Sequence, residues 1–76
     1  HILVIPKKHI TSAADINEEN SGVIAHIFEV IAKIAKEQNM SDGFRVVNNC
    51  GDSAGQTVKH IHFHLMSGRE FTWPAG

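Results

Sequence analysis

The sequence predicts an α+β fold in which one amphipathic helix packs on an antiparallel sheet. Three observations lead to this class: a helical stripe of apolar residues between Glu18 and Gln38, short β-prone runs on either side of it, and a cluster of turn-forming residues between the last two runs. Because 76 residues suffice for one small domain and not for two, we treat residues 1–76 as a single domain.

The composition narrows the class of protein further. Seven basic and eight acidic residues give a formal net charge of −1, which argues against a protein that binds nucleic acid. The longest unbroken apolar stretch, Ile2 to Ile5, falls far below the ~20 residues of a membrane span. The single cysteine, Cys50, cannot form an internal disulfide. We therefore expect a cytoplasmic protein without membrane partners, in which Cys50 is a bystander.

The first expected element is a strand over Ile2–Ile5. Four consecutive β-prone apolar residues are typical of a strand covered on both faces, and Pro6 ends it because proline cannot donate to a β-ladder. The chain enters this strand at once, so we expect the fold to be truncated at its N-terminal side. Residues 11–15 are expected to form a connector with one short helical turn.

A helix is expected from Glu18 to Gln38. Asn17 can cap its first turn, acidic residues follow at its positive end, and lysines lie towards its negative end. Its apolar residues recur at steps of three and four and form one stripe: Ile24, Ile27, Phe28, Ile31, Ile34 and Ala35.

Two further strands are expected after the helix. Residues 44–48 form the second strand, and the turn formers from Asn49 to Gly55 separate it from the third. The third strand runs from Thr57 to Met66, after which Ser67 and Gly68 break it.

The third strand carries the most informative pattern. Because side chains alternate along a strand, His60, His62 and His64 share one face. The opposite face is apolar and carries Ile61, Phe63 and Leu65. The apolar face can pack on the helix and leave the histidine face open to a ligand.

The histidines have a structural and a metal-binding interpretation. In the first they are half-exposed strand residues. In the second they bind zinc, for which imidazole is a common ligand. The Cα atoms of His60 and His64 would lie roughly 13 Å apart at ~3.3 Å per residue, so zinc would need a ligand from His9, Cys50 or a carboxylate. We expect no metal or other cofactor, and keep a zinc-binding domain as an alternative.

A third interpretation is phosphoryl or nucleotidyl transfer. Histidine titrates near ~6.5, so neighbouring imidazoles can divide the roles of nucleophile and cation. The loop from Gly51 to Gly55 can offer backbone N–H groups to phosphate oxygens, and Thr57 adds a hydroxyl.

These residues resemble the histidine triad family, whose signature is His-φ-His-φ-His-φ-φ with φ hydrophobic. Every position of the signature is matched by His60-Ile61-His62-Phe63-His64-Leu65-Met66. The flanks and the opening residues 1–10 look like the nucleotide-binding branch of purine nucleoside phosphoramidases; these flanks include Gly55-Gln56-Thr57-Val58 and Trp73-Pro74-Ala75-Gly76. In that branch a helix and a hairpin ahead of the position of His1 supply much of the base pocket, and this sequence lacks them.

The resemblance implies hydrolysis of a nucleoside 5′-phosphoramidate or related purine nucleotide at the α-phosphate. His62 would be the nucleophile that forms a covalent nucleotidyl intermediate, with His64 bonding the phosphate and His60 orienting His62. Thr57, where family members often carry serine, would pass a proton to the leaving group. The residues expected to contact the nucleotide are Asn49, Gly55, Gln56, His1 and Trp73. A nucleotide-binding regulatory module without catalysis is the alternative.

A homodimer is the expected assembly. A domain this small gains stability by burying surface in a partner, and Val23 and Val30 widen the helix stripe beyond what one sheet needs. The resemblance also favours a dimer, with Trp73 near the neighbouring subunit. We interpret His9 and His26 as solvated or capping residues.

Overall fold

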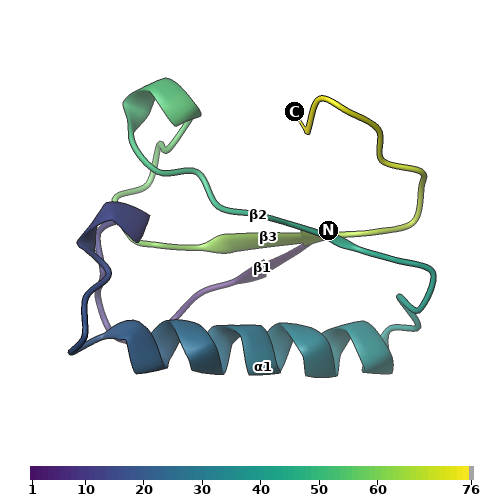
Figure 1. Cartoon of the computed structure of the whole chain (residues 1–76), viewed down its shortest axis with the longest axis horizontal. Helices are drawn as coiled ribbons and strands as arrows, with labels where there is room; N and C mark the ends of the chain where they lie inside the picture. The colour runs from purple at the N-terminus through teal and green to yellow at the C-terminus, as the bar shows by residue number, and fades with distance from the viewer. Residues whose placement is uncertain (76) are drawn as a thin grey trace.

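The computed structural model describes residues 1–75 and consists of a three-stranded antiparallel sheet with one α-helix packed on it (Figure 1). The sheet contains β1 (Ile2–Val4), β2 (Arg45–Val47) and β3 (Phe63–Met66) in the order β1-β3-β2. The helix is α1 (Ser21–Glu37), and two short 3₁₀ helices are η1 (Ala13–Asp15) and η2 (Asp52–Ala54). The predicted α+β class, including the helical turn within residues 11–15, is confirmed.

The register of the sheet divides its residues between two faces. Leu65 of the central strand lies opposite Ile2 of β1 and Val46 of β2, and directly opposed residues share a face. Leu65 is fully buried, and Ile2 and Val46 are packed against the same core, so this face meets α1.

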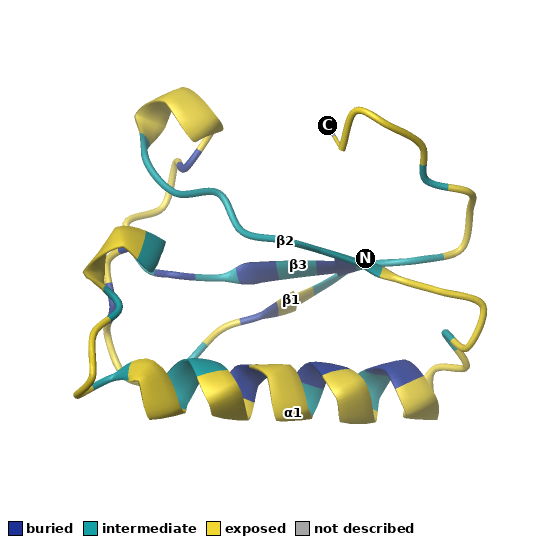
Figure 2. Cartoon of the chain, viewed as in Figure 1, coloured by how far each residue is buried: buried dark blue, intermediate teal, exposed yellow. Residues whose placement is uncertain are grey.

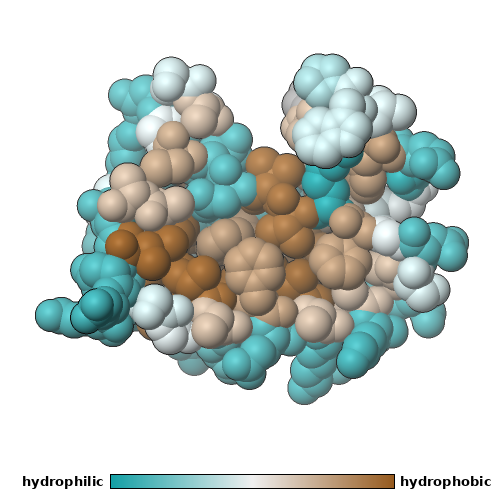
Figure 3. Space-filling view, in the orientation of Figure 1, coloured by the Kyte–Doolittle hydropathy of each residue, from teal (hydrophilic) through white to brown (hydrophobic). Residues whose placement is uncertain are grey.

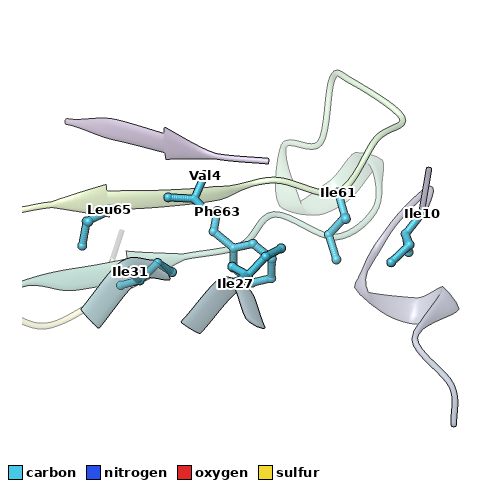
Figure 4. Packing of buried hydrophobic residues seen from close by; sticks show 7 residues of the cluster. All are labelled: Val4, Ile10, Ile27, Ile31, Ile61, Phe63 and Leu65. Carbon is cyan, nitrogen blue, oxygen red and sulfur yellow. The ribbon is translucent and has the colours of Figure 1, made fainter. Parts of the chain in front are cut away.

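The core lies between that face and the helix. Ile27 and Ile31 of α1, one turn apart, face Phe63 and Leu65 of β3 (Figure 4), and the buried side of α1 is the side turned towards the sheet (Figure 2). The buried cluster consists of Val4, Ile10, Ile27, Ile31, Ile61, Phe63 and Leu65. The predicted alternation is confirmed for the apolar set, since Ile61, Phe63 and Leu65 are all buried.

The helix begins later than predicted. The side-chain oxygen of Asn17 accepts the N–H groups of Glu19 and Asn20, so Asn17 caps a separate turn ahead of α1 and the helix starts at Ser21. Phe28, predicted to lie in the apolar stripe, is 47% exposed. Its ring contacts that of Phe63 in an edge-to-face arrangement, with 5.6 Å between ring centroids. Three helix residues, Ile27, Ile31 and Ala35, are buried.

Strand β1 is covered on one face only. Val4 is buried against the helix, whereas Leu3 on the other face is 52% exposed and Ile5 is also exposed. The prediction of a strand covered on both faces is therefore wrong for the described chain.

Strand β3 is shorter than predicted because its first half bonds elsewhere. The N–H of Ile61 donates to the carbonyl of Ile10 at 2.7 Å, so this stretch pairs with the connector after β1 rather than with a strand. Residues 57–62 are irregular, and Val58 is exposed.

The remaining apolar residues of the helix also pack within the protomer. Val23 and Val30 are half-buried against the core, so they do not form the free stripe that the sequence suggested. In residues 1–75, no helix has the length and apolar character needed to cross a membrane.

Candidate active site

The histidine face of the sheet lies on the side opposite α1. The loop that contains η2 and the C-terminal tail both rise from this side of the sheet (Figure 1), and the surface is hollowed between them (Figure 3). His64 belongs to this face, because its neighbours Phe63 and Leu65 are buried against the helix. The sheet thus separates the core from a face that is open to ligands.

His62 has a defined tautomer. Its Nδ1 lies 2.8 Å from the carbonyl oxygen of His60. A carbonyl oxygen can only accept, so Nδ1 carries the hydrogen and the neutral ring keeps a lone pair on Nε2. The side chain is half-buried, which leaves this nitrogen available as a nucleophile.

The backbone of His62 is held by Asn48, a residue that no sequence pattern indicated. Asn48, directly after β2, donates from Nδ2 to the carbonyl oxygen of His62 at 2.9 Å. An asparagine that follows a strand suggests a turn residue, and no local pattern connects it with a histidine fourteen positions later. The sequence pattern favoured its neighbour Asn49 as a site residue instead.

His60 is turned to the connector rather than to the other two histidines. Its Nε2 donates to the carbonyl oxygen of Pro6 at 2.9 Å, and its ring stacks on that of His9 with centroids 5.2 Å apart. The Nδ1 atoms of His60 and His9 are separated by 3.1 Å. His9 was interpreted as a solvated or capping residue; the structure corrects this, because the side chain of His9 is bonded to the triad.

His64 stands beside His62. Their ring centroids are 5.3 Å apart at an interplanar angle of 72°. Nδ1 of His64 lies 2.9 Å from Nε2 of His1. In the sheet register His64 is opposite Leu3 on one side and Val47 on the other, so two apolar side chains flank it.

The loop before the triad is fixed mainly by its own hydrogen bonds. The N–H groups of Gly51, Ala54 and Gly55 all donate within the loop, which leaves those of Asp52 and Ser53 for a ligand. Gly55 ends η2 with φ 86°, a left-handed conformation that suits glycine. The expectation that the whole stretch 51–55 offers N–H groups is therefore wrong for three of its residues.

Two predicted contact residues hold this loop together. Asn49 donates from Nδ2 to the carbonyl of Ala54 at 2.8 Å. Gln56 is buried; its Oε1 accepts from Gly51 N–H, and its Nε2 donates to the carbonyls of Thr11 and Val58. The structure gives both side chains a role in shaping the loop, and their contact with a nucleotide stays a prediction.

The loop also carries Thr57 and an exposed ion pair. Thr57 follows Gln56 and its side chain is exposed. Lys59 Nζ lies 2.6 Å from Asp52 Oδ1, and the hydrogen bond and charge of Lys59 lower the pKa of the Asp52 carboxyl. The lowered pKa keeps the Asp52 carboxyl ionised at neutral pH.

The tail is attached at the other end of the histidine face. The guanidinium of Arg45 donates to the carbonyl of Thr72 at 3.1 Å and lies 4.8 Å from the centroid of the Phe71 ring. Trp73 is 85% exposed, with Arg45 6.0 Å from its centroid. A cavity of about 190 Å³ separates the tail from β2 and β3, with Val47 and Met66 in its wall.

A zinc site is not assembled in the part of the chain that the structure describes. His9 lies beside His60, but no group of three or more His, Cys, Asp or Glu side chains is placed to hold one ion there. The ligand sets that the sequence left open therefore gain no support from the positions of residues 1–75.

Fold and site together define an α+β protein with a helix on one face of a small sheet and a cluster of imidazoles on the other. One of these imidazoles, His62, has an unprotonated Nε2. The HIT domain matches residues 1–71, and the chain belongs to the HIT family. This confirms the histidine triad family that the sequence resembles. Its purine nucleoside phosphoramidase branch stays a prediction.

Relatives and solved structures agree with this assignment. Over 76 residues the chain is 40% identical to an uncharacterized HIT-like protein of Synechococcus elongatus and covers 67% of it. The crystal structure of a HIT family hydrolase from Legionella pneumophila aligns with 97% of the chain and 67% of its own length, at 44% identity and a TM-score of 0.93. The crystal structure of a histidine triad nucleotide-binding protein from Candida albicans aligns with 97% of this chain and 59% of its own length, at 30% identity and a TM-score of 0.73. The chain thus spans about two thirds or less of the length of these proteins.

Proposed function

We propose that the protein hydrolyses a nucleoside 5′-phosphoramidate or a related purine nucleotide at the α-phosphate, through a nucleotidyl group carried on His62. The observation that carries the proposal is the bond from His62 Nδ1 to the carbonyl of His60, because it leaves Nε2 with a lone pair. The Legionella relative is a HIT family hydrolase and the Candida relative a nucleotide-binding protein, which supports this substrate class.

The first step transfers the nucleotidyl group to the enzyme. The lone pair of His62 Nε2 attacks the α-phosphorus, the Nε2–P bond forms, and the P–N bond to the leaving amine breaks. The amine takes the electron pair of that bond together with a proton delivered through the hydroxyl of Thr57. The carbonyl of His60 accepts from Nδ1–H and stabilises the positive charge on the nucleotidylated ring.

The second step releases the product. Water attacks phosphorus, the Nε2–P bond breaks, and its electron pair returns to Nε2, while the proton lost by the water leaves through Thr57 or solvent. The product is a nucleoside 5′-monophosphate. Two steps with low barriers then replace one difficult displacement.

The phosphate is held next to the nucleophile. When His1 Nε2–H donates to His64 Nδ1, the other nitrogen of His64 carries its hydrogen and can donate to a non-bridging oxygen. The free N–H groups of Asp52 and Ser53 are further donors at the loop. Leu3 and Val47, which flank His64, offer apolar surface to the sugar and base.

The test is hydrolysis of an adenosine phosphoramidate by the protein in its complete length, with and without excess chelator. We expect nucleoside monophosphate to appear at the same rate in both, since each proposed step uses only groups of the chain and water. Turnover that stops in chelator and returns only with zinc would contradict the proposal in favour of a metal site. Binding of the nucleotide without any turnover would contradict it in favour of a regulatory module.

A further inference from the structure

The stretch that leads into the triad is bonded along its length to the connector after β1. Ile61 N–H donates to the carbonyl of Ile10 at 2.7 Å, and Gln56 Nε2 donates to that of Thr11 at the same distance. His60 Nε2 adds a third link to the carbonyl of Pro6. Residues 6–11 therefore hold residues 56–61 in place through these three hydrogen bonds.

The hydrogen bonds of His9 and His60 have one consistent direction when both rings are neutral. The carbonyl of Pro6 accepts, so His60 carries its hydrogen on Nε2 and has a lone pair on Nδ1. His9 Nδ1, at 3.1 Å from that lone pair, must then carry a hydrogen and donate it. His9 Nε2 is left to accept from the hydroxyl of Thr11, whose Oγ1 lies 3.3 Å away.

This chain of bonds fixes both nitrogens of the His60 ring. One is held by the main chain at Pro6 and the other by His9, whose ring also stacks on it at an interplanar angle of 23°. A ring held at both nitrogens cannot flip or change tautomer without losing a bond. The backbone carbonyl of His60 accepts from His62 Nδ1, so a shift of His60 changes the orientation of the His62 ring directly.

We propose that His9 is a positioning residue for the reaction. Thr11 donates to His9 Nε2, and His9 Nδ1–H donates to the lone pair of His60, which fixes the tautomer and rotation of the His60 ring. The fixed position of His60 in turn holds the carbonyl that orients His62. This inference rests on the proposed function, because it assigns His9 to the same reaction. Without His9, we expect water to bond to His60 Nδ1, so that the hydrogen can sit on either ring nitrogen and the bond to the carbonyl of Pro6 can break.

Kinetics of four variants of the full-length protein separate positioning from mere packing. In His9→Ala we expect kcat to fall about ten-fold or more, the lower range for loss of a partner that orients an imidazole, with KM little changed. His9→Asn keeps an N–H donor near the place of Nδ1 and should recover most of the rate. Thr11→Val removes only the last donor and should give a smaller loss. His26→Ala, on the helix across the sheet, is the matched control and should match wild type.

Nitrogen-15 spectra of the histidine rings supply a measurement that does not depend on turnover. In wild type we expect His60 protonated at Nε2 and bare at Nδ1, and His9 protonated at Nδ1. In His9→Ala the two His60 forms should mix, and in His9→Asn the single form should return. A wild-type His60 protonated at Nδ1, or a His9→Ala protein with unchanged kcat and unchanged His60 spectrum, would overturn the inference. A wild-type protein that shows the expected spectrum but no hydrolysis would contradict the proposed function and leave the bonding of His9 to His60 supported.

Discussion

At the scale of single residues, two main-chain carbonyls determine the chemistry of the histidine cluster. The carbonyl of His60 places a hydrogen on Nδ1 of His62, and the carbonyl of Pro6 places one on Nε2 of His60. Two side chains of the same type, two positions apart, thus hold opposite tautomers. In the proposed reaction, this difference distinguishes His62, the nucleophile, from His60, which positions it.

His62→Asn should abolish turnover and leave the fold intact. The asparagine amide can still donate to the carbonyl of His60, but nothing replaces Nε2, so we expect the rate to fall by several orders of magnitude, as for loss of other covalent nucleophiles. Steady-state kinetics, nucleotide titration and thermal melting measure the three properties. Activity within a few-fold of wild type would remove His62 from its role, and His26→Asn serves as the control for a histidine outside the site.

Asn48→Ala should weaken both stability and catalysis. It removes the half-buried hydrogen bond to the carbonyl of His62, which costs about 1 kcal/mol, and it frees the peptide that carries the proposed nucleophile. Urea denaturation and turnover are the measurements. Asn48→Asp, which has the same shape but no N–H donor, should be at least as harmful, and wild-type behaviour of both variants would show that the bond is unimportant.

At the scale of elements, the buried side chain of Gln56 connects the η2 loop to the rest of the protein. Gln56 is buried and uses its oxygen for the loop, and its nitrogen for the connector and for its own segment. The exposed pair of Asp52 and Lys59 joins the same loop to residues near the triad. Because exposed ion pairs contribute little and buried amides contribute more, we expect Gln56 to dominate the stability of this region.

Gln56→Leu should lower the free energy of unfolding by about 2–3 kcal/mol, because three hydrogen bonds lose their partner at once. Denaturant titration at neutral pH measures it. Asp52→Asn in the same loop is the control and should unfold like wild type within error. Since Lys59 lowers the pKa of Asp52, any contribution of this pair is present at neutral pH and is lost as the pH falls through that lowered pKa. A Gln56→Leu protein no less stable than Asp52→Asn would contradict the role of Gln56.

Local patterns predicted the elements but not the contacts between them. The helix and the alternation along the third strand follow from periods of 3.6 and 2, and the first two strands follow from short β-prone runs, all of which lie within one segment. The bonds that shape the site join residues far apart, such as His60 to Pro6 and Asn48 to His62. Such side-chain to main-chain bonds have no periodicity. The sequence therefore showed the face that carries His62 and His64, whereas the prediction that His60 shares it is wrong and the contacts of His9 and Asn48 were not foreseen.

At the scale of the whole molecule, much apolar surface of the protomer is exposed. The large apolar side chains that are exposed in residues 1–75 come from β1, α1 and the segments between and after the elements: Leu3, Ile5, Phe28, Phe44, Val58 and Trp73. Figure 3 shows apolar side chains gathered over the region between α1 and the sheet. Such surface in a small domain favours association, and we propose a homodimer on this ground, with Trp73 near the partner.

Sedimentation of the full-length protein at micromolar concentration should therefore give a dimer, and the fluorescence of Trp73 should change on dilution as the partner leaves. The pair Val30→Glu and Ile34→Glu should lower the stability of the protomer, because both residues are half-buried against its own core, and should dissociate the dimer only through that loss. The stability of the monomer is therefore measured in parallel. A monomer at that concentration, with Trp73 fluorescence indifferent to dilution, would contradict the dimer.

The central claim is that Nε2 of His62 bonds covalently to the nucleotide. The most direct measurement is rapid mixing of the full-length protein with an adenosine phosphoramidate, followed by a quench that preserves the phosphorus–nitrogen bond, proteolysis and mass spectrometry. We expect an adenylyl group on the peptide that contains His62, formed at least as fast as product is released and absent in His62→Asn. Turnover without any histidine adduct, or an adduct that persists in His62→Asn, would contradict the account.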